Sequence, residues 1–265
     1  MLRHLFSQVK KLKNTNGSQI SLPAGFGLRA FASLGSTNDE AKILANQGIS
    51  DGTVIWAAEQ TVGRGRQGRN WTSPPGNLYA SVLLRDIGPM AQAAQLSFVT
   101  ALAMADAISQ FIPKPDLLTL KWPNDLLLDG AKICGILLES GKDPFGHDWI
   151  VIGTGVNVNS HPDNTIYSAT NLHQFQCDVS VENLLSSYIY KLSEWHNRWR
   201  SQGFAPIRAS WLNRAAKLGQ VITVKLPAHK QIEGVFRDMN ADGAIEVQLA
   251  NGTIETVSAG DVFFN

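Results

Sequence analysis

The sequence predicts a mixed α+β domain followed by a small all-β barrel. Helix and strand signals are interleaved over most of the chain, which has 44% hydrophobic and 17% charged residues, so a substantial core is available. After Leu218 short alternating runs are separated by the turn signals Asp242-Gly243 and Asn251-Gly252, a pattern typical of a barrel of about 45 residues. The expected divisions are residues 1–25, 26–217 and 218–265.

The first helix of the larger part has clear start and stop signals. Thr37 with Glu40 three residues later matches a capping box, and Gly48 ends the apolar pattern. Beta-branched and aromatic runs on both sides of this helix predict strands. The remaining elements of this region are strands at 28–31, 53–58 and 78–84 and a long, buried, Ala-rich helix at 91–112.

A hairpin is predicted around Asp129-Gly130, a dipeptide that favours a tight turn between antiparallel strands. The segment 118–125 leads into this hairpin. Apolar residues at helical spacing later predict an amphipathic helix. The elements expected from here on are strands at 126–128, 131–139 and 149–158, helices at 181–202 and 206–217, and barrel strands at 221–226, 232–236, 244–249 and 253–257.

Charge and cysteine content exclude several classes of protein. The net charge of +1 argues against a general nucleic-acid or membrane-surface protein, because such proteins carry a basic field. Cys134 and Cys177 are far apart and lack metal-ligand spacing, which fits a reducing compartment. No apolar run is expected to reach the roughly 18 residues that span a bilayer.

Residues 1–25 form a basic leader. No Asp or Glu precedes Asp39, and apolar residues recur among basic ones in an amphipathic pattern, the composition of an organelle transit peptide. A short leader of a cytoplasmic protein, or an upstream start codon, is the favoured interpretation, and the transit peptide stays open. About 25 residues are too few for a DNA-binding helical domain.

The stretch Gly63-Arg-Gly-Arg-Gln-Gly-Arg-Asn-Trp71 is the strongest functional signal. Its glycines permit close approach of the backbone to a ligand, and its arginines suit phosphate or carboxylate. The glycines also match a dinucleotide-binding pattern, but Pro74-Pro75 follows where that pattern requires a helix. A solvated basic loop, or a patch that binds nucleic acid nonspecifically, is the simpler alternative.

Further polar clusters lie at strand ends or turns, where binding residues collect. Each has a structural explanation on its own: Ser36 and Thr37 can cap a helix, Trp71 can anchor a loop, and Lys132 can be an exposed turn lysine. The clusters are Ser36 to Asn38, Gln60 with the loop, Lys121 to Lys132, and Gly153 to Asn159.

Together the clusters resemble the biotin–protein ligases, which attach biotin to a carrier protein. The resemblance covers about residues 28–264 and implies a mixed-sheet catalytic domain of the biotin/lipoate ligase (class II synthetase-like) type, followed by an SH3-like barrel. It rests on Ser36-Thr-Asn38, the 63–71 loop with Ser73-Pro74, Gly76-Asn-Leu-Tyr79, Lys121-Trp-Pro-Asn-Asp125, Lys132 with Gly135-Ile-Leu-Leu-Glu139, and Gly153-Thr-Gly-Val-Asn157.

The resemblance implies an ATP-dependent, AMP-forming ligase with biotinyl-5′-AMP as intermediate. Joining a carboxylate to ATP brings an anion onto a polyanion, which calls for fixed positive charge. Lys132, Arg64 and Arg66 are the implied catalytic residues. Residues implied to bind biotin are Ser36, Thr37, Asn38, Gln60, Arg64, Gly65, Arg66 and Lys132, and those implied to bind the nucleotide are Arg69, Trp71, Lys121, Asn124 and Asn157.

The same resemblance implies the partners. Mg²⁺ should arrive with ATP rather than in a protein metal cage, and the acceptor should be the biotin carboxyl carrier protein of acetyl-CoA carboxylase or of a related carboxylase. A homodimer is compatible with the family, and the short leader predicts no operator binding. Asp125 is a candidate base for the acceptor lysine, but its neighbours Lys121 and Asn124 also suit a structural role. A lipoate–protein ligase and a non-catalytic biotin- or nucleotide-binding module are the alternatives.

Overall fold

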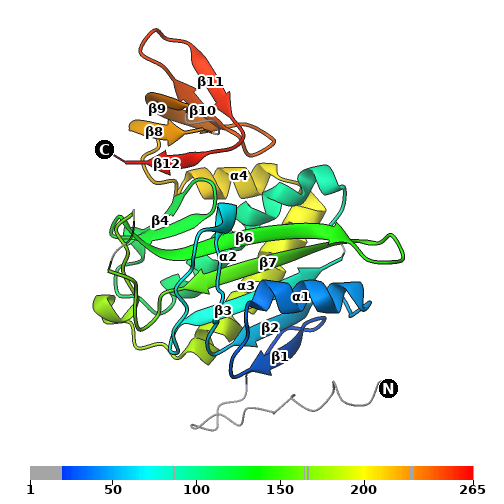
Figure 1. Cartoon of the computed structure of the whole chain (residues 1–265). Coiled ribbons are helices and arrows are strands. Elements are labelled where there is room, and N and C mark those ends of the chain that lie inside the picture. The colour runs from blue at the N-terminus through cyan, green and yellow to red at the C-terminus, as the bar shows by residue number, and fades with distance from the viewer. Residues whose placement is uncertain (1–19, 86, 164, 166, 227–229, 265) are drawn as a thin grey trace, which may run out of the picture.

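The computed structural model describes residues 20–264 apart from 86, 164, 166 and 227–229 (Figure 1). Most of the basic leader predicted at 1–25 therefore lies outside the described residues. The described chain forms a large α+β part and a smaller β part beside it, as the sequence predicts.

A seven-stranded sheet forms the centre of the larger part, in the order β1-β2-β3-β7-β6-β5-β4. β1 and β2 are parallel, and the other neighbouring strands are antiparallel. Its strands are β1 (Gly27–Phe31), β2 (Thr53–Ala57), β3 (Leu78–Leu84), β4 (Leu118–Lys121), β5 (Asp125–Leu128), β6 (Ala131–Lys142) and β7 (Asp148–Val156).

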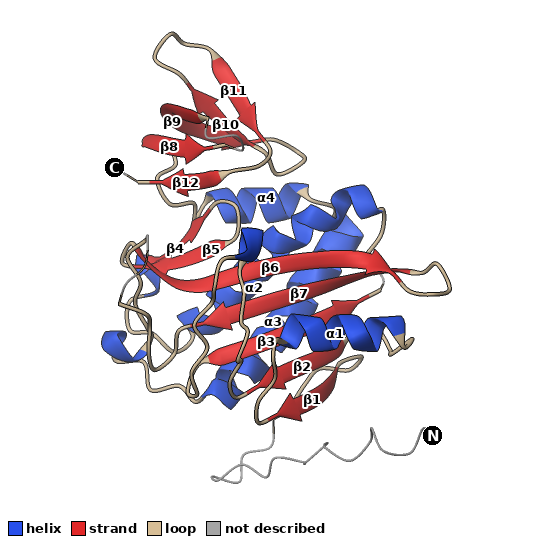
Figure 2. Ribbon diagram, in the orientation of Figure 1, coloured by secondary structure: helices blue, strands red, loops and turns tan. Residues whose placement is uncertain are grey.

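Helices cover both faces of this sheet (Figure 2). α1 (Thr37–Asn46) packs on one face, where Ile55, Leu83 and Val151 meet its apolar side. α2 (Leu96–Ser109) and α3 (Val181–Gln202) cover the other face, and α4 (Ala205–Leu212) packs against both of them. Twelve of the 14 residues of α2 are buried, because this helix lies between the sheet and α3.

α1 covers only part of its face of the sheet, and the site lies over the part that is left uncovered. The ten-residue helix packs over β2, β3 and β7. Side chains alternate along a strand, so the residues two and four positions beyond Val151 on β7 continue the same face. These residues are Gly153 and Gly155, whose missing side chains leave space above the sheet.

The smaller part is a five-stranded antiparallel sheet in the order β11-β10-β9-β8-β12. Its apolar residues belong to the same continuous core as α2 and the seven-stranded sheet. The Trp122 indole N–H donates to the Gly243 carbonyl over 3.0 Å, and Arg208 of α4 pairs with Asp238 over 2.5 Å. The strands are β8 (Val221–Lys225), β9 (Gln231–Met239), β10 (Ile245–Gln248), β11 (Ile254–Val257) and β12 (Asp261–Phe263).

The Asp129-Gly130 hairpin is confirmed, and both residues have the positive φ (51° and 79°) that a tight primed turn requires. The capping box is wrong. Ser36, not Thr37, is the residue before the first turn of α1, and its side chain makes no capping hydrogen bond. The Thr37 hydroxyl instead donates to Gln60, so tertiary contacts direct this cluster.

The expectation that no apolar run is long enough to span a bilayer is wrong for one segment. The segment Met90–Ser109 is long and apolar enough to cross a membrane by length and composition alone. Of its most apolar window, 72% is buried inside the protein, as in a core helix. The segment begins as a 3₁₀ helix, η2 (Met90–Gln95), and continues as α2, which matches the predicted long buried helix.

Candidate active site

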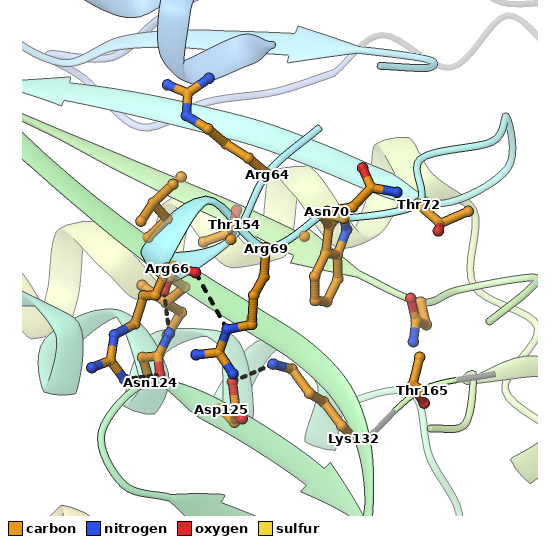
Figure 3. Close-up of a pocket in the computed structure, with 18 of the residues that line it drawn as sticks. Arg64, Arg66, Arg69, Asn70, Thr72, Asn124, Asp125, Lys132, Thr154 and Thr165 are labelled. Carbon is orange, nitrogen blue, oxygen red and sulfur yellow. Dashed lines mark hydrogen bonds and ion pairs between the residues drawn. The ribbon is translucent and has the colours of Figure 1, made fainter. Parts of the chain in front are cut away.

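A cavity of about 430 Å³ lies on the α1 face of the sheet, beside the end of that helix where the sheet is uncovered. Its volume falls within the range of small-molecule sites. It is lined by the 63–71 loop, by segments of the strands β6 and β7, and by residues near Lys132 (Figure 3).

The 63–71 loop forms a small closed hairpin. The Gly65 N–H donates to the Arg69 carbonyl over 2.7 Å, and the Trp71 N–H donates to the Gly63 carbonyl over 3.0 Å. A short 3₁₀ turn, η1 (Arg66–Gly68), forms the tip. Residues 72–77, which follow the loop, are not helical, as the two prolines in the sequence predict.

Arg64 points away from the other two arginines of the loop and toward α1 (Figure 3). Its guanidinium makes a two-pronged pair with Asp39 at 2.6 and 2.7 Å and reaches Glu139 at 3.0 Å. The hydrogen bonds from Arg64 lower the pKa of Asp39 to about 2, against the opposing effect of its partial burial. Arg64 therefore ties the loop to α1.

Arg66 and Arg69 lie on the opposite side of the hairpin. Arg69 contacts both carboxylate oxygens of Asp261 at 3.0 Å, and Arg66 reaches one of them at 3.4 Å. Arg66 also donates to the Asn124 side-chain oxygen over 3.2 Å. The Asn124 amide in turn donates to the Ile136 carbonyl over 2.6 Å, which fixes its orientation.

Glycines form the floor of the cavity, because the Trp71 and Asn38 side chains pack directly against the backbone of β7. A Cβ atom at Gly155 would come within 2.5 Å of the Trp71 indole nitrogen, and one at Gly153 within 2.2 Å of the Asn38 amide oxygen. Real Cβ contacts are never this short, so any larger residue would displace Trp71 or Asn38. Gly153 and Gly155 are therefore sites where side chains approach the strand backbone closely.

One end of the cavity carries uncharged polar groups with fixed orientations. The Gln60 amide oxygen accepts from the Thr37 N–H at 2.8 Å, and its NH₂ donates to the Ser73 hydroxyl at 3.1 Å. The Asn38 NH₂ donates to Glu139 at 2.8 Å, while its oxygen accepts from Ser81 at 2.6 Å. Each amide therefore presents a defined edge to a ligand.

The other end carries cations. Lys132 pairs with Asp125 at 2.5 Å and lies 5.3 Å from the centre of the Trp71 ring. Lys121 lies behind this pair, 3.5 Å from Asp125 and 3.7 Å from the centre of the Tyr167 ring. Burial lowers the pKa of Lys121, and the neighbouring Asp125 acts in the opposite direction. Asp125 thus holds two ammonium groups.

The structure brings most of the predicted site residues to this one cavity. Thr37 and Lys121 lie behind its wall, where Thr37 orients Gln60 and Lys121 supports Asp125. The buried Asn157 donates to the Thr170 carbonyl at 3.0 Å. The predicted residues that line the cavity are Ser36, Asn38, Gln60, Arg64, Gly65, Arg66, Arg69, Trp71, Asn124, Lys132 and Asn157.

Several lining residues were not among the predicted binding or catalytic residues, although two of them belong to the Gly135–Glu139 motif. Gly135 and Leu137 share the strand face that Glu139 occupies, so the two-residue alternation of β6 could have revealed them. Tyr167 lies in an irregular segment with no periodic signal, and Asp261 comes from the distant barrel. Neither carries a local sequence pattern that points to the cavity.

Comparisons with known proteins agree with this geometry. Residues 30–157 match the Biotin/lipoate A/B protein ligase family, and residues 217–265 match the Biotin protein ligase C terminal domain. The biotin--[acetyl-CoA-carboxylase] ligase of Paracoccus denitrificans is 38% identical over 235 residues, which cover 86% of this chain and 97% of that protein. This chain belongs to the biotin–protein ligase family.

Solved structures of biotin–protein ligases share the fold. The Aquifex aeolicus enzyme in complex with biotin and ATP superimposes with a TM-score of 0.77 at 26% identity, over 89% of this chain and 97% of that one. The Leishmania major enzyme in complex with biotinyl-5-AMP gives a TM-score of 0.63 at 26% identity, over 88% and 99% of the two chains. The predicted fold class, a mixed-sheet ligase domain followed by a barrel, is confirmed.

Proposed function

We propose that this chain is an ATP-dependent biotin–protein ligase that makes biotinyl-5′-AMP and transfers biotin to a lysine of a carrier protein. The observation that carries the proposal is a single cavity with an uncharged, hydrogen-bonding end and a cationic end, joined by a floor of glycines beneath Trp71. The named relative and the solved complexes with biotin and ATP support this assignment.

Biotin has a ureido ring at one end and a carboxylate at the other, and both suit this cavity. The ureido ring offers one carbonyl acceptor and two N–H donors, so it needs neutral donors and acceptors in fixed positions. Ser36, Asn38 and Gln60 line that end of the cavity, and Thr37 orients Gln60 from behind. The carboxylate then extends toward Lys132.

In the first step, a carboxylate oxygen of biotin attacks the α-phosphorus of ATP. A C–O–P bond forms, the α–β phosphoanhydride bond breaks, and pyrophosphate leaves with the electron pair. Lys132, with Arg66 and Arg69, supplies positive charge where two anions must meet, and a side-chain nucleophile is not required. Arg64 and Gly65 belong to the same loop, which we expect to close over the adenylate and exclude water.

Trp71 and Asn157 are proposed to contact the nucleotide. Trp71 offers an aromatic face near Lys132, and Asn157 lines the same end of the cavity. Asn124 and Arg69 complete that wall, and Lys121 supports it through Asp125.

Mg²⁺ is proposed to enter with ATP. The described residues contain no group of three His, Cys, Asp or Glu residues that could hold a metal ion. Asp125 and Asp261 line the cationic end, and carboxylate oxygens suit Mg²⁺ as ligands alongside phosphate. When bound, the ion would neutralise charge on the phosphates.

In the second step, a lysine amine of the acceptor attacks the acyl carbon of the adenylate. An amide bond forms, the C–O bond between the acyl carbon and the phosphate breaks, AMP leaves with the electron pair, and the amine releases a proton. The proposed acceptor is the biotin carboxyl carrier protein of acetyl-CoA carboxylase, because the Paracoccus relative is named for that activity. A homodimer and a cytoplasmic location are further expectations, which sedimentation of the purified protein and cell fractionation would test.

The deciding experiment is pyrophosphate–ATP exchange with biotin, lipoate or no acid present. We expect label to enter ATP only with biotin, because the polar end of the cavity suits a ureido ring better than an apolar dithiolane. Exchange that depends on lipoate would instead support a lipoate–protein ligase. Binding of biotin and ATP without any exchange would indicate a non-catalytic module.

A further inference from the structure

The C-terminal barrel contributes a carboxylate to the arginine loop, residues 63–71. Asp261 is the first residue of β12, and its pairing opposite Lys225 of β8 fixes it to the barrel sheet. Arg69 contacts its two oxygens at 3.0 Å, and Arg66 contacts one at 3.4 Å. Arg66 also donates to the Gly260 carbonyl at 3.3 Å. Two loop arginines therefore hold one end of one barrel strand.

A second, independent contact holds the same strand beside the cavity. Phe263, two residues after Asp261, packs against Tyr167 with ring centres 4.9 Å apart. Tyr167 lines the cavity and covers the ammonium group of Lys121. β12 is thus held against the cationic end by an aromatic contact as well as by charge, so the position of Asp261 does not depend on the arginines alone.

The other cations of the site have partners within the larger part of the chain. Arg64 pairs with Asp39 and Glu139, and Lys132 and Lys121 pair with Asp125. Arg66 and Arg69 differ because their shared carboxylate comes from the barrel, about 190 residues away in sequence. The hairpin tip that carries them is therefore tied to the barrel as well as to Asn124, whereas the base is tied to the larger part of the chain.

We propose that Asp261 is a positioning residue that keeps Arg66 and Arg69 facing the cavity, so that the barrel controls how long the adenylate is retained. The predicted effect on the adenylate rests on the proposed function, whereas the predicted effect on the loop does not. With Asp261 neutralised, the two guanidinium groups lose their shared charged partner, Arg66 keeps only its contacts with Asn124 and Gly260, and the hairpin tip opens more often. The bound adenylate then escapes faster.

Trypsin tests the loop without any ligand, because it cleaves after arginine in accessible, mobile segments. Asp261→Asn should speed cleavage after Arg66 and Arg69 about two- to five-fold, the range that a partly exposed ion pair supports. Asp261→Glu should restore slow cleavage, because it keeps the charge. Asp238→Asn is the matched control, since Asp238 also joins the barrel to the larger part, through Arg208 of α4.

Equal acceleration in the Asp261→Asn and Asp238→Asn variants would overturn the proposal, because it would indicate general loosening of the barrel. Unchanged cleavage in Asp261→Asn would also overturn it. The two failures are separate: a parent protein that makes no biotinyl-AMP contradicts the proposed function, whereas the cleavage experiment still decides the role of Asp261.

Release of preformed biotinyl-AMP tests the consequence for catalysis. Asp261→Asn should release it about two- to five-fold faster than the parent. In an Arg69→Ala background, Asp261→Asn should speed release by less than it does in the parent, because one of the two ion pairs of Asp261 is already missing. Additive effects would overturn the coupling. Slower release from Asp261→Asn would show instead that Asp261 competes with the adenylate for the arginines, which contradicts the proposal.

Discussion

At the scale of single residues, the charged groups of this site form ion pairs with one another. Asp39 and Glu139 hold Arg64, Asp125 holds Lys132, and Asp261 holds Arg69. Preformed pairs keep long side chains in place and lower the cost of ordering them when a ligand binds. An incoming carboxylate or phosphate must either share these cations or displace their partners.

Lys132→Ala should reduce biotin-dependent pyrophosphate–ATP exchange about 100-fold or more, because it removes a fixed positive charge where the two anions meet. Lys142→Ala is the matched control. Lys142 lies on the same strand, β6, but its ammonium group is largely exposed and pairs with Asp148 away from the cavity. Exchange at the parent rate in Lys132→Ala would contradict the role given to this lysine.

Asp39→Asn should lower the free energy of unfolding in a pH-dependent way. The pKa of Asp39 is lowered from 3.8 to about 2, chiefly by hydrogen bonds from Arg64, so the stabilisation is present above pH 4 and is lost as the pH falls toward 2. The side chain is 48% exposed, so solvent screening limits the effect to about 0.5–1 kcal/mol.

Denaturant unfolding of parent and variant between pH 2 and pH 7 measures this effect. Glu40→Gln controls for the interaction of a first-turn carboxylate with the N-terminus of α1. A difference for Asp39→Asn that stayed constant down to pH 2 would show that the ion pair with Arg64 is not its cause.

At the scale of elements, β7 sets the depth of the cavity through two glycines on one face. Gly153 leaves room for Asn38 at the polar end, and Gly155 leaves room for Trp71 toward the cationic end. The two positions are successive residues of one strand face, so one strand supports both ends of the cavity.

Gly153→Ala should raise the KM for biotin with little change in the KM for ATP, because its methyl group displaces Asn38. Gly155→Ala should mainly raise the KM for ATP, because it displaces Trp71. Each added methyl group should also lower the free energy of unfolding by about 1–3 kcal/mol, because it overfills a packed site. Steady-state kinetics with each substrate varied in turn, together with denaturant unfolding, measures both effects.

Gly27→Ala provides the control for strand glycines, since a Cβ atom at this position in β1 meets no atom within 4 Å. We expect this variant to keep both KM values. Identical kinetic changes in the Gly153 and Gly155 variants would contradict the division of the cavity into two ends.

The sequence predicted elements well where one pattern dominated. β3 at 78–84 and α3 at 181–202 match their predicted bounds, because a continuous apolar run and a helical apolar stripe determine them. The helix predicted at 206–217 is wrong beyond Leu212, where the chain leaves helix to pair with β4 at Leu120. β12 was missed, because three residues carry no periodicity and its partner β8 is far away in sequence.

At the scale of the whole molecule, the two sheets share one core, and the site uses both parts of the chain. Ile222 and Val247 of the barrel belong to the same apolar cluster as α2 and β3. The sequence predicted the local clusters at 36–38, 63–71 and 121–132 because each is a compact motif. It did not predict Asp261 at the cavity, since that contact follows from how the barrel docks and not from any local pattern.

Trp122→Phe should loosen this docking. Trp122 is 3% exposed, and its indole N–H satisfies the Gly243 carbonyl of the barrel. A phenyl ring leaves that carbonyl without its donor and fills less space, so the free energy of unfolding should fall by about 2 kcal/mol. The displaced barrel should also carry Asp261 away from the arginine loop, so tryptic cleavage after Arg66 and Arg69 should accelerate.

Trp195→Phe is the matched control, because the Trp195 indole donates to Asp106 over 2.7 Å on the side of α2 and α3. It should also lower stability, by about 1–2 kcal/mol, but leave cleavage of the loop at the parent rate. Denaturant unfolding gives the stabilities, and mass spectrometry of the tryptic fragments gives the cleavage sites. Because the core is continuous, we expect the parent to unfold in one transition by fluorescence and circular dichroism. Acceleration of loop cleavage in both variants would show that it follows global stability, whereas acceleration in Trp122→Phe alone would tie the arginine loop to the docked barrel.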